Sequence, residues 1–262
     1  MNGICNQHEA TRRRARTFEK KLCRSSREKS AGRARRENDV LSGSDHHDWA
    51  ALRRAMVEEQ IRRRGVKSAR VLEAMSRVPR HLFVPEELAA HSYEDRALGI
   101  GEQQTISQPY MVAAMTEFLE LRGDERVLEV GAGSGYQAAI LAELAREVIT
   151  VEKNAGLAES ARARISALGY GSVRVEVGDG TLGWPEAAPF NGILVAAAAP
   201  AIPQPLVAQL AEGGRLIIPV GESDKQMLMR IRKRGGEIGE EKLFACQFVP
   251  LRGCYGWTDA AE

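Results

Sequence analysis

The chain has 262 residues, with 37 Lys and Arg against 35 Asp and Glu, and a formal net charge of +2 at pH 7. No stretch approaches the ~20 apolar residues of a membrane-spanning helix, and no apolar run of a secretory signal follows the basic residues near the start, so we expect a cytoplasmic protein without a membrane segment. The four cysteines form no C-x-x-C pair, so no metal site is expected and reduced thiols fit best.

The first 47 residues are predicted to form a disordered basic tail. Residues 1–40 carry 12 Lys and Arg against 5 Asp and Glu, a local charge of +7, and show no apolar periodicity. Such a segment cannot bury enough apolar surface to offset the entropy lost on ordering. A basic tail can contact nucleic acid, but more often it is a solvated extension. Residues 48–262 are predicted to form a single domain.

A helical region is predicted between the tail and the first strand of the core. Residues 68–75 read as a short amphipathic helix capped by Ser68. A polar loop with two glycines follows at residues 99–109. The next helix is predicted to begin at Pro109, because proline suits the first helical turn, with Ser107 as its N-terminal cap.

The most informative stretch is residues 127–136, which read VLEVGAGSGY. An apolar strand leads into a loop with glycine at every second position, and a helical pattern follows at once. This order is typical of a nucleotide-type site at the carboxyl end of a parallel strand. A dinucleotide fingerprint would need a further glycine where Tyr136 stands, so a pyrophosphate ligand is disfavoured.

An acidic residue beside this loop indicates the charge of the ligand. Glu129 would repel a pyrophosphate, but it suits a cationic ligand such as the amino group and sulfonium of S-adenosylmethionine. The alternative is a glycine-rich turn that binds nothing. The cofactor contacts predicted in this stretch are Glu129, Gly131, Gly133 and Ser134.

Two further carboxyl groups follow the next two strands. Glu152 comes directly after the strand at residues 148–151, at a distance from the glycine loop where a carboxylate accepts hydrogen bonds from ribose hydroxyls. Asp179 follows the strand at residues 173–177, where it can reach an adenine amino group, with Gly180 beside it. Glu152 could instead be a solvated charge at a helix start, and Asp179 a plain turn residue. We favour cofactor contact, because both lie at the same edge of the sheet.

The alternation of strands and helices predicts the fold class. Further strands are expected at residues 192–195 and 215–220, and a terminal pair at residues 227–231 and 243–249, whose order is left open. Strands that alternate with helices imply a doubly wound, mainly parallel α/β sheet covered on both faces.

Several motifs make the chain from about residue 56 to 251 resemble the protein-L-isoaspartate (D-aspartate) O-methyltransferases. The motifs are residues 78–85 (VPRHLFVP), 104–111 (QTISQPYM), 129–136 (EVGAGSGY), 178–180, 183–185, 196–200, 213–216, 219–221 and 248–251. The resemblance implies the Rossmann-like fold of the class I S-adenosylmethionine-dependent methyltransferases. Two departures are visible, since Asn191 replaces the usual Asp and Ala132 the usual Thr.

The resemblance implies methyl transfer from S-adenosylmethionine to the α-carboxyl group of L-isoaspartyl and D-aspartyl residues in damaged proteins. A carboxylic acid is already ionised at neutral pH, so no strong general base is required. Ser107 is the family's candidate catalytic residue, which could orient the substrate carboxylate. It also counts with Ile106 among the cofactor contacts, and Thr105 and Gln108 are expected to contact the substrate.

Two other classes of function compete with this one. A nucleic-acid methyltransferase acting on base amines usually has a polar motif after the fourth strand, where this chain has the apolar residues 196–200. Methylation at carbon 5 of pyrimidines needs a cysteine nucleophile, and no cysteine lies between residues 24 and 245. A non-catalytic protein-binding module on the same fold is the second alternative. The retention of Ser107, Glu129, Glu152 and Asp179 argues against it.

Overall fold

The computed structural model describes residues 47–222 and 224–258. Apart from residue 47, the predicted tail lies outside these residues. Within the described part of the chain, none of the helices combines the length and the apolar composition that crossing a bilayer requires.

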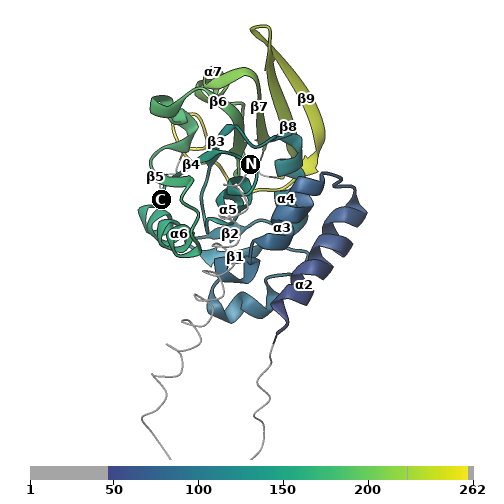
Figure 1. The fold of residues 1–262 in the computed structure, drawn as a ribbon. Coiled ribbons are helices and arrows are strands. Elements are labelled where there is room, and N and C mark those ends of the chain that lie inside the picture. The colour runs from purple at the N-terminus through teal and green to yellow at the C-terminus, as the bar shows by residue number, and fades with distance from the viewer. Residues whose placement is uncertain (1–46, 223, 259–262) are drawn as a thin grey trace, which may run out of the picture.

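The described part of the chain has helices first and continues as an alternation of strands and helices (Figure 1). The α-helices are α2 (Trp49–Ala55), α3 (Ala69–Arg77), α4 (Pro109–Phe118), α5 (Tyr136–Ala142), α6 (Ala155–Leu168) and α7 (Gln204–Ala208). The short π- and 3-10 helices are η1 (Met56–Ile61), η2 (Arg62–Arg64), η3 (Arg80–Phe83), η4 (Glu86–His91), η5 (Gly180–Leu182) and η6 (Pro185–Ala187). The N-terminal helical region packs on the rest of the domain through α3, which contacts α4 and α5.

A seven-stranded sheet with the order β5-β4-β3-β6-β7-β8-β9 forms the centre of the molecule. Its strands are β3 (Arg126–Val130), β4 (Glu147–Glu152), β5 (Val173–Val177), β6 (Phe190–Val195), β7 (Leu210–Gly221), β8 (Gln226–Arg234) and β9 (Glu237–Cys246). The first five strands in this order, β5, β4, β3, β6 and β7, are parallel to one another. Strand β8 pairs antiparallel with β7, and β9 pairs antiparallel with β8. A separate hairpin joins β1 (Leu98–Gly101) to β2 (Gln104–Ile106). The predicted doubly wound, mainly parallel fold is confirmed.

The central strand β3 is buried on both faces because helices cover the sheet from both sides. Val127 packs with Met115 of α4 in one apolar layer, whereas Leu128 belongs to the layer on the opposite face. Side chains alternate along a strand, so Glu129 shares the face of Val127. The sequence thus places a carboxyl group in an otherwise apolar layer.

The last two strands form a long hairpin on the β7 edge, which settles their order. β9 begins at Glu237, although the hydropathy predicted a strand only at residues 243–249. Residues 237–242 are exposed and mostly polar, so no alternation marks them. The turn at Gly235 and Gly236, both at positive φ, pairs them with β8. Residues 247–249 leave the sheet instead and run toward the cavity described below.

The predicted cap of α4 is wrong, while the cap of α3 is confirmed. Pro109 occupies the first position of α4, so the cap position falls on Gln108, whose side chain makes no capping hydrogen bond. Ser107 stands one residue too early to cap the helix. In α3, the Ser68 Oγ accepts a hydrogen bond from the Val71 N–H at 3.4 Å.

This difference predicts unequal effects of two matched serine substitutions on stability. Ser68→Ala should lower the free energy of unfolding by roughly 0.5–1 kcal/mol, the lower part of the usual range for a lost cap, because the hydrogen bond is long. Ser107→Ala removes no cap, so it should lower the free energy of unfolding by less than Ser68→Ala does. Urea denaturation of both variants measures the effects. Equal losses would mean that Ser107 stabilises the helix after all.

Candidate active site

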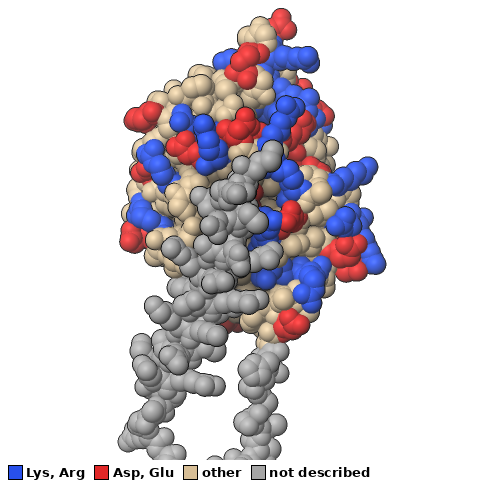
Figure 2. Space-filling view, viewed as in Figure 1, with Lys and Arg blue, Asp and Glu red and all other residues tan. Residues whose placement is uncertain are grey.

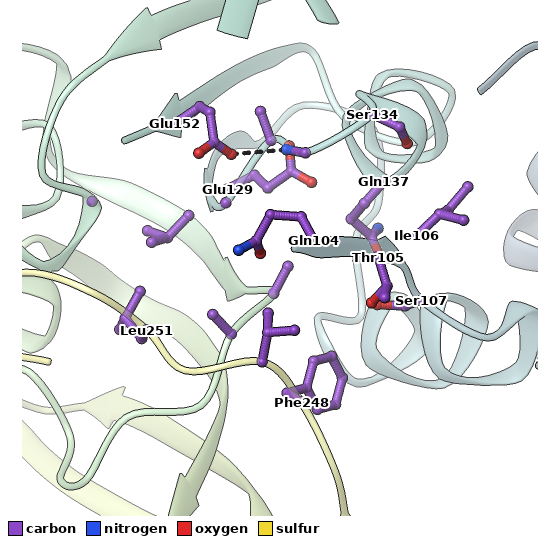
Figure 3. A pocket seen from close by; sticks show the side chains of 18 of the residues that line it. Gln104, Thr105, Ile106, Ser107, Glu129, Ser134, Gln137, Glu152, Phe248 and Leu251 are labelled. Atoms are coloured by element: carbon purple, nitrogen blue, oxygen red, sulfur yellow. Dashed lines mark hydrogen bonds between the residues drawn. The ribbon is translucent and has the colours of Figure 1, made fainter. Parts of the chain in front are cut away.

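A cavity of about 410 Å³ lies at the carboxyl ends of β3, β4 and β6. Its lining comes from the β1–β2 hairpin with the loop before α4, from α4 and the start of α5, from the glycine loop after β3, from the ends of β4 and β6, from Gly180, and from residues 248–252. Figure 3 shows Glu129 and Glu152 on one side of the cavity and Thr105 and Ser107 across from Glu152. The parallel fold thus brings together groups from distant parts of the sequence.

The glycine loop turns sharply between β3 and α5. Gly131, Gly133 and Gly135 adopt φ values of 93°, 50° and 86°, which side chains rarely allow. Gly135 occupies the cap position of α5. The predicted contacts Gly131, Gly133 and Ser134 all line the cavity, so a ligand there would lie against backbone and one short polar side chain.

Glu152 fixes this loop from the neighbouring strand. One carboxylate oxygen accepts a hydrogen bond from the Gly133 N–H at 2.9 Å, and the other accepts one from the Asn154 N–H at 3.0 Å. The carboxylate is held at the cavity wall between the loop and the start of α6. Each oxygen keeps a further lone pair for a ligand hydroxyl.

Glu129 is completely buried and lines the same cavity. Neither of its carboxyl oxygens has a hydrogen-bond partner of good geometry among the described residues. Burial raises the pKa of Glu129 to about 8; the nearby Thr150 hydroxyl lowers it only in part, and the charge of Glu152 raises it further. A buried carboxyl group without partners is costly unless a ligand satisfies it. The site therefore fits a ligand with a positively charged group at this position.

Gly180 lines the cavity, whereas Asp179 is engaged elsewhere. A Cβ added to Gly180 would lie 2.5 Å from the Val130 Cγ1 atom, so only glycine fits there. The Asp179 carboxylate accepts hydrogen bonds from the Thr181 N–H at 2.9 Å and from the Cys254 N–H at 2.8 Å. Asp179 thereby attaches the C-terminal segment to the end of β5. Its contact with an adenine amino group stays a prediction.

The loop before α4 belongs to two cavities at once. Thr105, Ile106 and Ser107 line the first cavity. Thr105 and Ser107 also line a second cavity of about 670 Å³, together with Gln108 and residues 244–249. Gln108 does not reach the first cavity, and its Nε2 donates to the Asp95 Oδ1 at 2.9 Å. Thr105 at the end of β2 and Ser107 in the loop after it therefore lie between two spaces, one for each of two reactants.

The C-terminal wall of the first cavity was missed by sequence reasoning. The Ala198 N–H donates to the Val249 carbonyl, and the Leu251 N–H donates to the Ala198 carbonyl, both at 2.8 Å. The Trp257 Nε1 donates to the same Ala198 carbonyl at 3.1 Å. Residues 248–251 are one of the family-like motifs, so a signal was present. Nothing local indicated that they lie against β6.

Several other polar side chains of the cavity were also missed, among them those of Gln104, Gln137 and Asn154. Gln137 is nearly buried, and its Nε2 donates to the Thr116 Oγ1 at 2.9 Å, which joins α5 to α4. Asn154 caps α6 through the Leu157 N–H at 3.0 Å. Their positions directly beside the predicted motifs were the available signal.

Comparisons with known proteins agree with this site. A sequence model of the protein-L-isoaspartate(D-aspartate) O-methyltransferase family (PCMT) matches residues 51–255. A protein-L-isoaspartate O-methyltransferase of Trichlorobacter lovleyi is 55% identical over 206 residues, which cover 78% of this chain and 95% of that protein. One of Geobacter metallireducens is 56% identical over 206 residues, with the same shares of 78% and 95%.

Solved structures are similar over the same region. A protein-L-isoaspartate O-methyltransferase aligns with a TM-score of 0.69 and 29% identity over 78% of this chain and 67% of that chain. A Plasmodium falciparum protein that bears the same name, in complex with S-adenosyl-L-homocysteine, aligns with a TM-score of 0.67 and 27% identity over 76% of this chain and 98% of that chain. Since the family match covers residues 51–255 and includes every predicted site residue, the chain belongs to the protein-L-isoaspartate(D-aspartate) O-methyltransferase family.

Proposed function

We propose that this protein transfers a methyl group from S-adenosylmethionine to the α-carboxyl group of L-isoaspartyl and D-aspartyl residues in damaged proteins and peptides. The observation that carries the proposal is the pair of cavities that meet at Thr105 and Ser107. One cavity suits the methyl donor and the other suits a peptide. The backbone amide nitrogen of the next residue then attacks the ester carbonyl without help from the protein, which forms a succinimide and releases methanol. Water opens the succinimide and returns part of it to normal aspartate.

The first cavity fits S-adenosylmethionine, which supplies an electrophilic methyl group on a sulfonium when bound. The unpartnered carboxyl group of Glu129 suits the positive charge of the methionine part. The Glu152 carboxylate can accept hydrogen bonds from the ribose hydroxyls, and Gly131 and Gly133 allow the cofactor to approach the backbone closely. The S-adenosyl-L-homocysteine bound to the P. falciparum relative supports the same choice of ligand.

The second cavity suits the peptide that carries the damaged residue. It runs between α4 and the end of β9 and is lined by Tyr110, Phe244 and Phe248 along with Gln108. An α-carboxylate that enters past Ser107 is already ionised, so the chain has to align it rather than deprotonate it. Alignment of reacting groups contributes ~7–11 kcal/mol in intramolecular models. The Ser107 hydroxyl is the group that we assign to this alignment.

The alternative of a nucleic-acid methyltransferase has less support. On the face shown in Figure 2, basic and acidic side chains are interspersed rather than gathered into a basic stripe. Ion pairs such as Arg230–Glu241 and Arg232–Glu120 likewise bring the two signs together. A nucleic-acid site needs a basic surface that follows the phosphates. We therefore infer that protein and peptide chains are the partners.

We also propose that residues 48–262 act as one domain in the cytoplasm. Cys246 and Cys254 are free thiols, which suit a reducing compartment.

The proposed activity predicts selective ester formation. Incubated with labelled S-adenosylmethionine, the purified protein should esterify an isoaspartyl peptide and leave its normal aspartyl twin almost unlabelled. The reason is that the carboxyl group of the isoaspartyl residue stands on a backbone that is one methylene longer. Base-labile radioactivity in the two peptides measures the difference. Equal labelling of both peptides, or labelling of RNA alone, would sink the assignment.

The role of Ser107 predicts a loss of turnover without a matching loss of stability. A lost hydrogen bond to a charged group costs ~1.5–3 kcal/mol, so Ser107→Ala should lower kcat/KM roughly ten- to hundredfold. The affinity for the cofactor should change little. Ser68→Ala is the matched control, since it should destabilise the fold and leave kcat/KM unchanged. If Ser107→Ala kept the kcat/KM of the wild type, Thr105 would become the candidate for aligning the substrate carboxylate.

The pKa of Glu129 predicts that cofactor binding depends on pH. Its pKa of about 8 leaves the group mostly protonated at pH 7. A cationic ligand favours the ionised form, so binding should release a proton at pH 7, and the affinity should rise as the pH approaches 8. Calorimetry in two buffers of different ionisation enthalpy measures the protons released. The isosteric variant Glu129→Gln should bind more weakly and release none.

The same variant gives an independent check on the unliganded protein. The folded-state pKa lies above the ordinary value of 4.5, so the unfolded chain loses its proton first as the pH rises. The stability that Glu129 contributes is therefore complete below pH 4.5 and is lost by about pH 8. The Tm of Glu129→Gln should exceed that of the wild type at pH 8, and the gap should narrow toward pH 5. Parallel pH profiles would contradict an ionisable buried Glu129.

A further inference from the structure

Arg80 is a completely buried arginine at the start of η3, directly behind the loop that carries Ser107. Its Nε donates to the Ser92 carbonyl at 2.7 Å, and its Nη2 donates to the Ser107 carbonyl at 2.8 Å. Nη1 has no hydrogen-bond partner among the described residues. No carboxylate within that part of the chain pairs with the guanidinium, and the aromatic rings of Tyr136 and Tyr93 lie near it.

A buried charge of this kind has an energetic cost. Removing a guanidinium from water without an opposite charge destabilises the folded state, and apolar side chains of similar volume are often better tolerated at such positions. The carbonyl groups of Ser92 and Ser107 accept hydrogen bonds from two of the guanidinium nitrogens, but Nη1 has no acceptor among the described residues, so the network is only partly satisfied. Burial lowers the pKa of Arg80 for the same reason.

The guanidinium also connects the two loops of the site. Its Cζ lies 4.9 Å from the ring centroid of Tyr136, the first residue of α5 after the glycine loop. The Tyr136 ring meets the Phe83 ring edge-to-face, with 5.3 Å between centroids. The Cζ of Arg164 lies 6.0 Å from the centroid of the Phe83 ring, and the Arg164 Nη1 donates to the Ser134 carbonyl at 2.7 Å. One packed cluster thus holds a carbonyl of the Ser107 loop and a carbonyl of the glycine loop.

We propose that Arg80 is a positioning residue for methyl transfer, which holds the Ser107 carbonyl and so fixes the loop that lies between the two cavities. This inference rests on the proposed function. The planar fork of the guanidinium donates to Ser92 and Ser107 from two nitrogens in a fixed geometry. A lysine ammonium keeps the charge but is a point donor on a flexible stem. Charge alone is therefore insufficient, and the fork is what sets the distance between the acceptor carboxylate and the methyl donor.

The experiment compares Arg80→Lys with the same substitution at Arg70, an exposed arginine that makes a similar pair of hydrogen bonds. Arg70 likewise donates to two backbone carbonyls, those of Leu121 and Leu144, at 2.8 and 3.0 Å, and it lines neither cavity. Arg70→Lys should lower the Tm and leave kcat for an isoaspartyl peptide unchanged. Arg80→Lys, assayed well below its Tm with both substrates saturating, should lower kcat roughly ten- to hundredfold, because small misplacements of reacting groups have effects of that size. The Kd for S-adenosyl-L-homocysteine should stay close to that of the wild type.

Chemical rescue supplies a second readout that a purely structural role would not move. Arg80→Ala leaves a void of the shape of the side chain, so guanidinium chloride at concentrations far below denaturation should restore part of kcat. Ser107→Ala, which lacks the hydroxyl and keeps Arg80, should show no rescue. An Arg80→Lys variant with wild-type kcat, or a loss shared equally with Arg70→Lys, overturns the proposal.

Two other outcomes are equally decisive. If neither Arg80 variant folds, Arg80 acts in the fold alone and the positioning role is rejected. A wild-type protein that binds the cofactor but esterifies no isoaspartyl peptide rejects the proposed function itself, and the role of Arg80 falls with it. An active wild type beside an unaffected Arg80→Lys rejects only the role of Arg80.

Discussion

The parallel pairing of β3 with β4 and β6 is the constraint on which the rest of the site depends. Parallel strands end at the same edge of a sheet, so the chain reversals after them lie side by side. Glu152 uses this closeness, because its carboxylate at the end of β4 holds the loop that follows β3. The C-terminal segment then closes the cavity by bonding to Ala198 just beyond β6. Without the common edge, none of these contacts between loops could form.

Two buried ionisable side chains flank the site, an acid and a base, and among the described residues neither has a partner of opposite charge. Glu129 is buried among the described residues without a good hydrogen-bond partner, and Arg80 is buried without a carboxylate partner. Each arrangement destabilises the folded protein, whose total stability is of the order of ~5–15 kcal/mol. Under the proposed function, Glu129 would meet a cationic donor and Arg80 would lie behind an anionic acceptor. The stability lost by burying these two groups would then allow the site to bind two ligands of opposite charge.

The loop before α4 links these features. It leaves β2 at Ile106 and enters α4 at Pro109, so only Ser107 and Gln108 lie between a strand and a helix whose positions packing determines. Arg80 holds its backbone from behind, and Asp95 holds the Gln108 side chain. A short loop held at both ends can keep a hydroxyl in place without a hydrogen bond of its own. This suits a reaction that relies on alignment rather than on acid–base chemistry.

The sequence by itself determined the strand, glycine loop and helix around Glu129, the place of Glu152, and the mainly parallel fold. These features follow from hydrophobic periodicity and from the special conformations of glycine, which depend on near neighbours in the chain. Only the tertiary structure decided that Ser107 is no cap, that Gln108 lies in the second cavity, and that Asp179 binds the backbone of Cys254. It also decided that Arg80 reaches Ser107. Apart from the position of the helix start relative to Ser107, these contacts join residues far apart in the sequence, so they depend on how whole elements pack, and no local pattern encodes them.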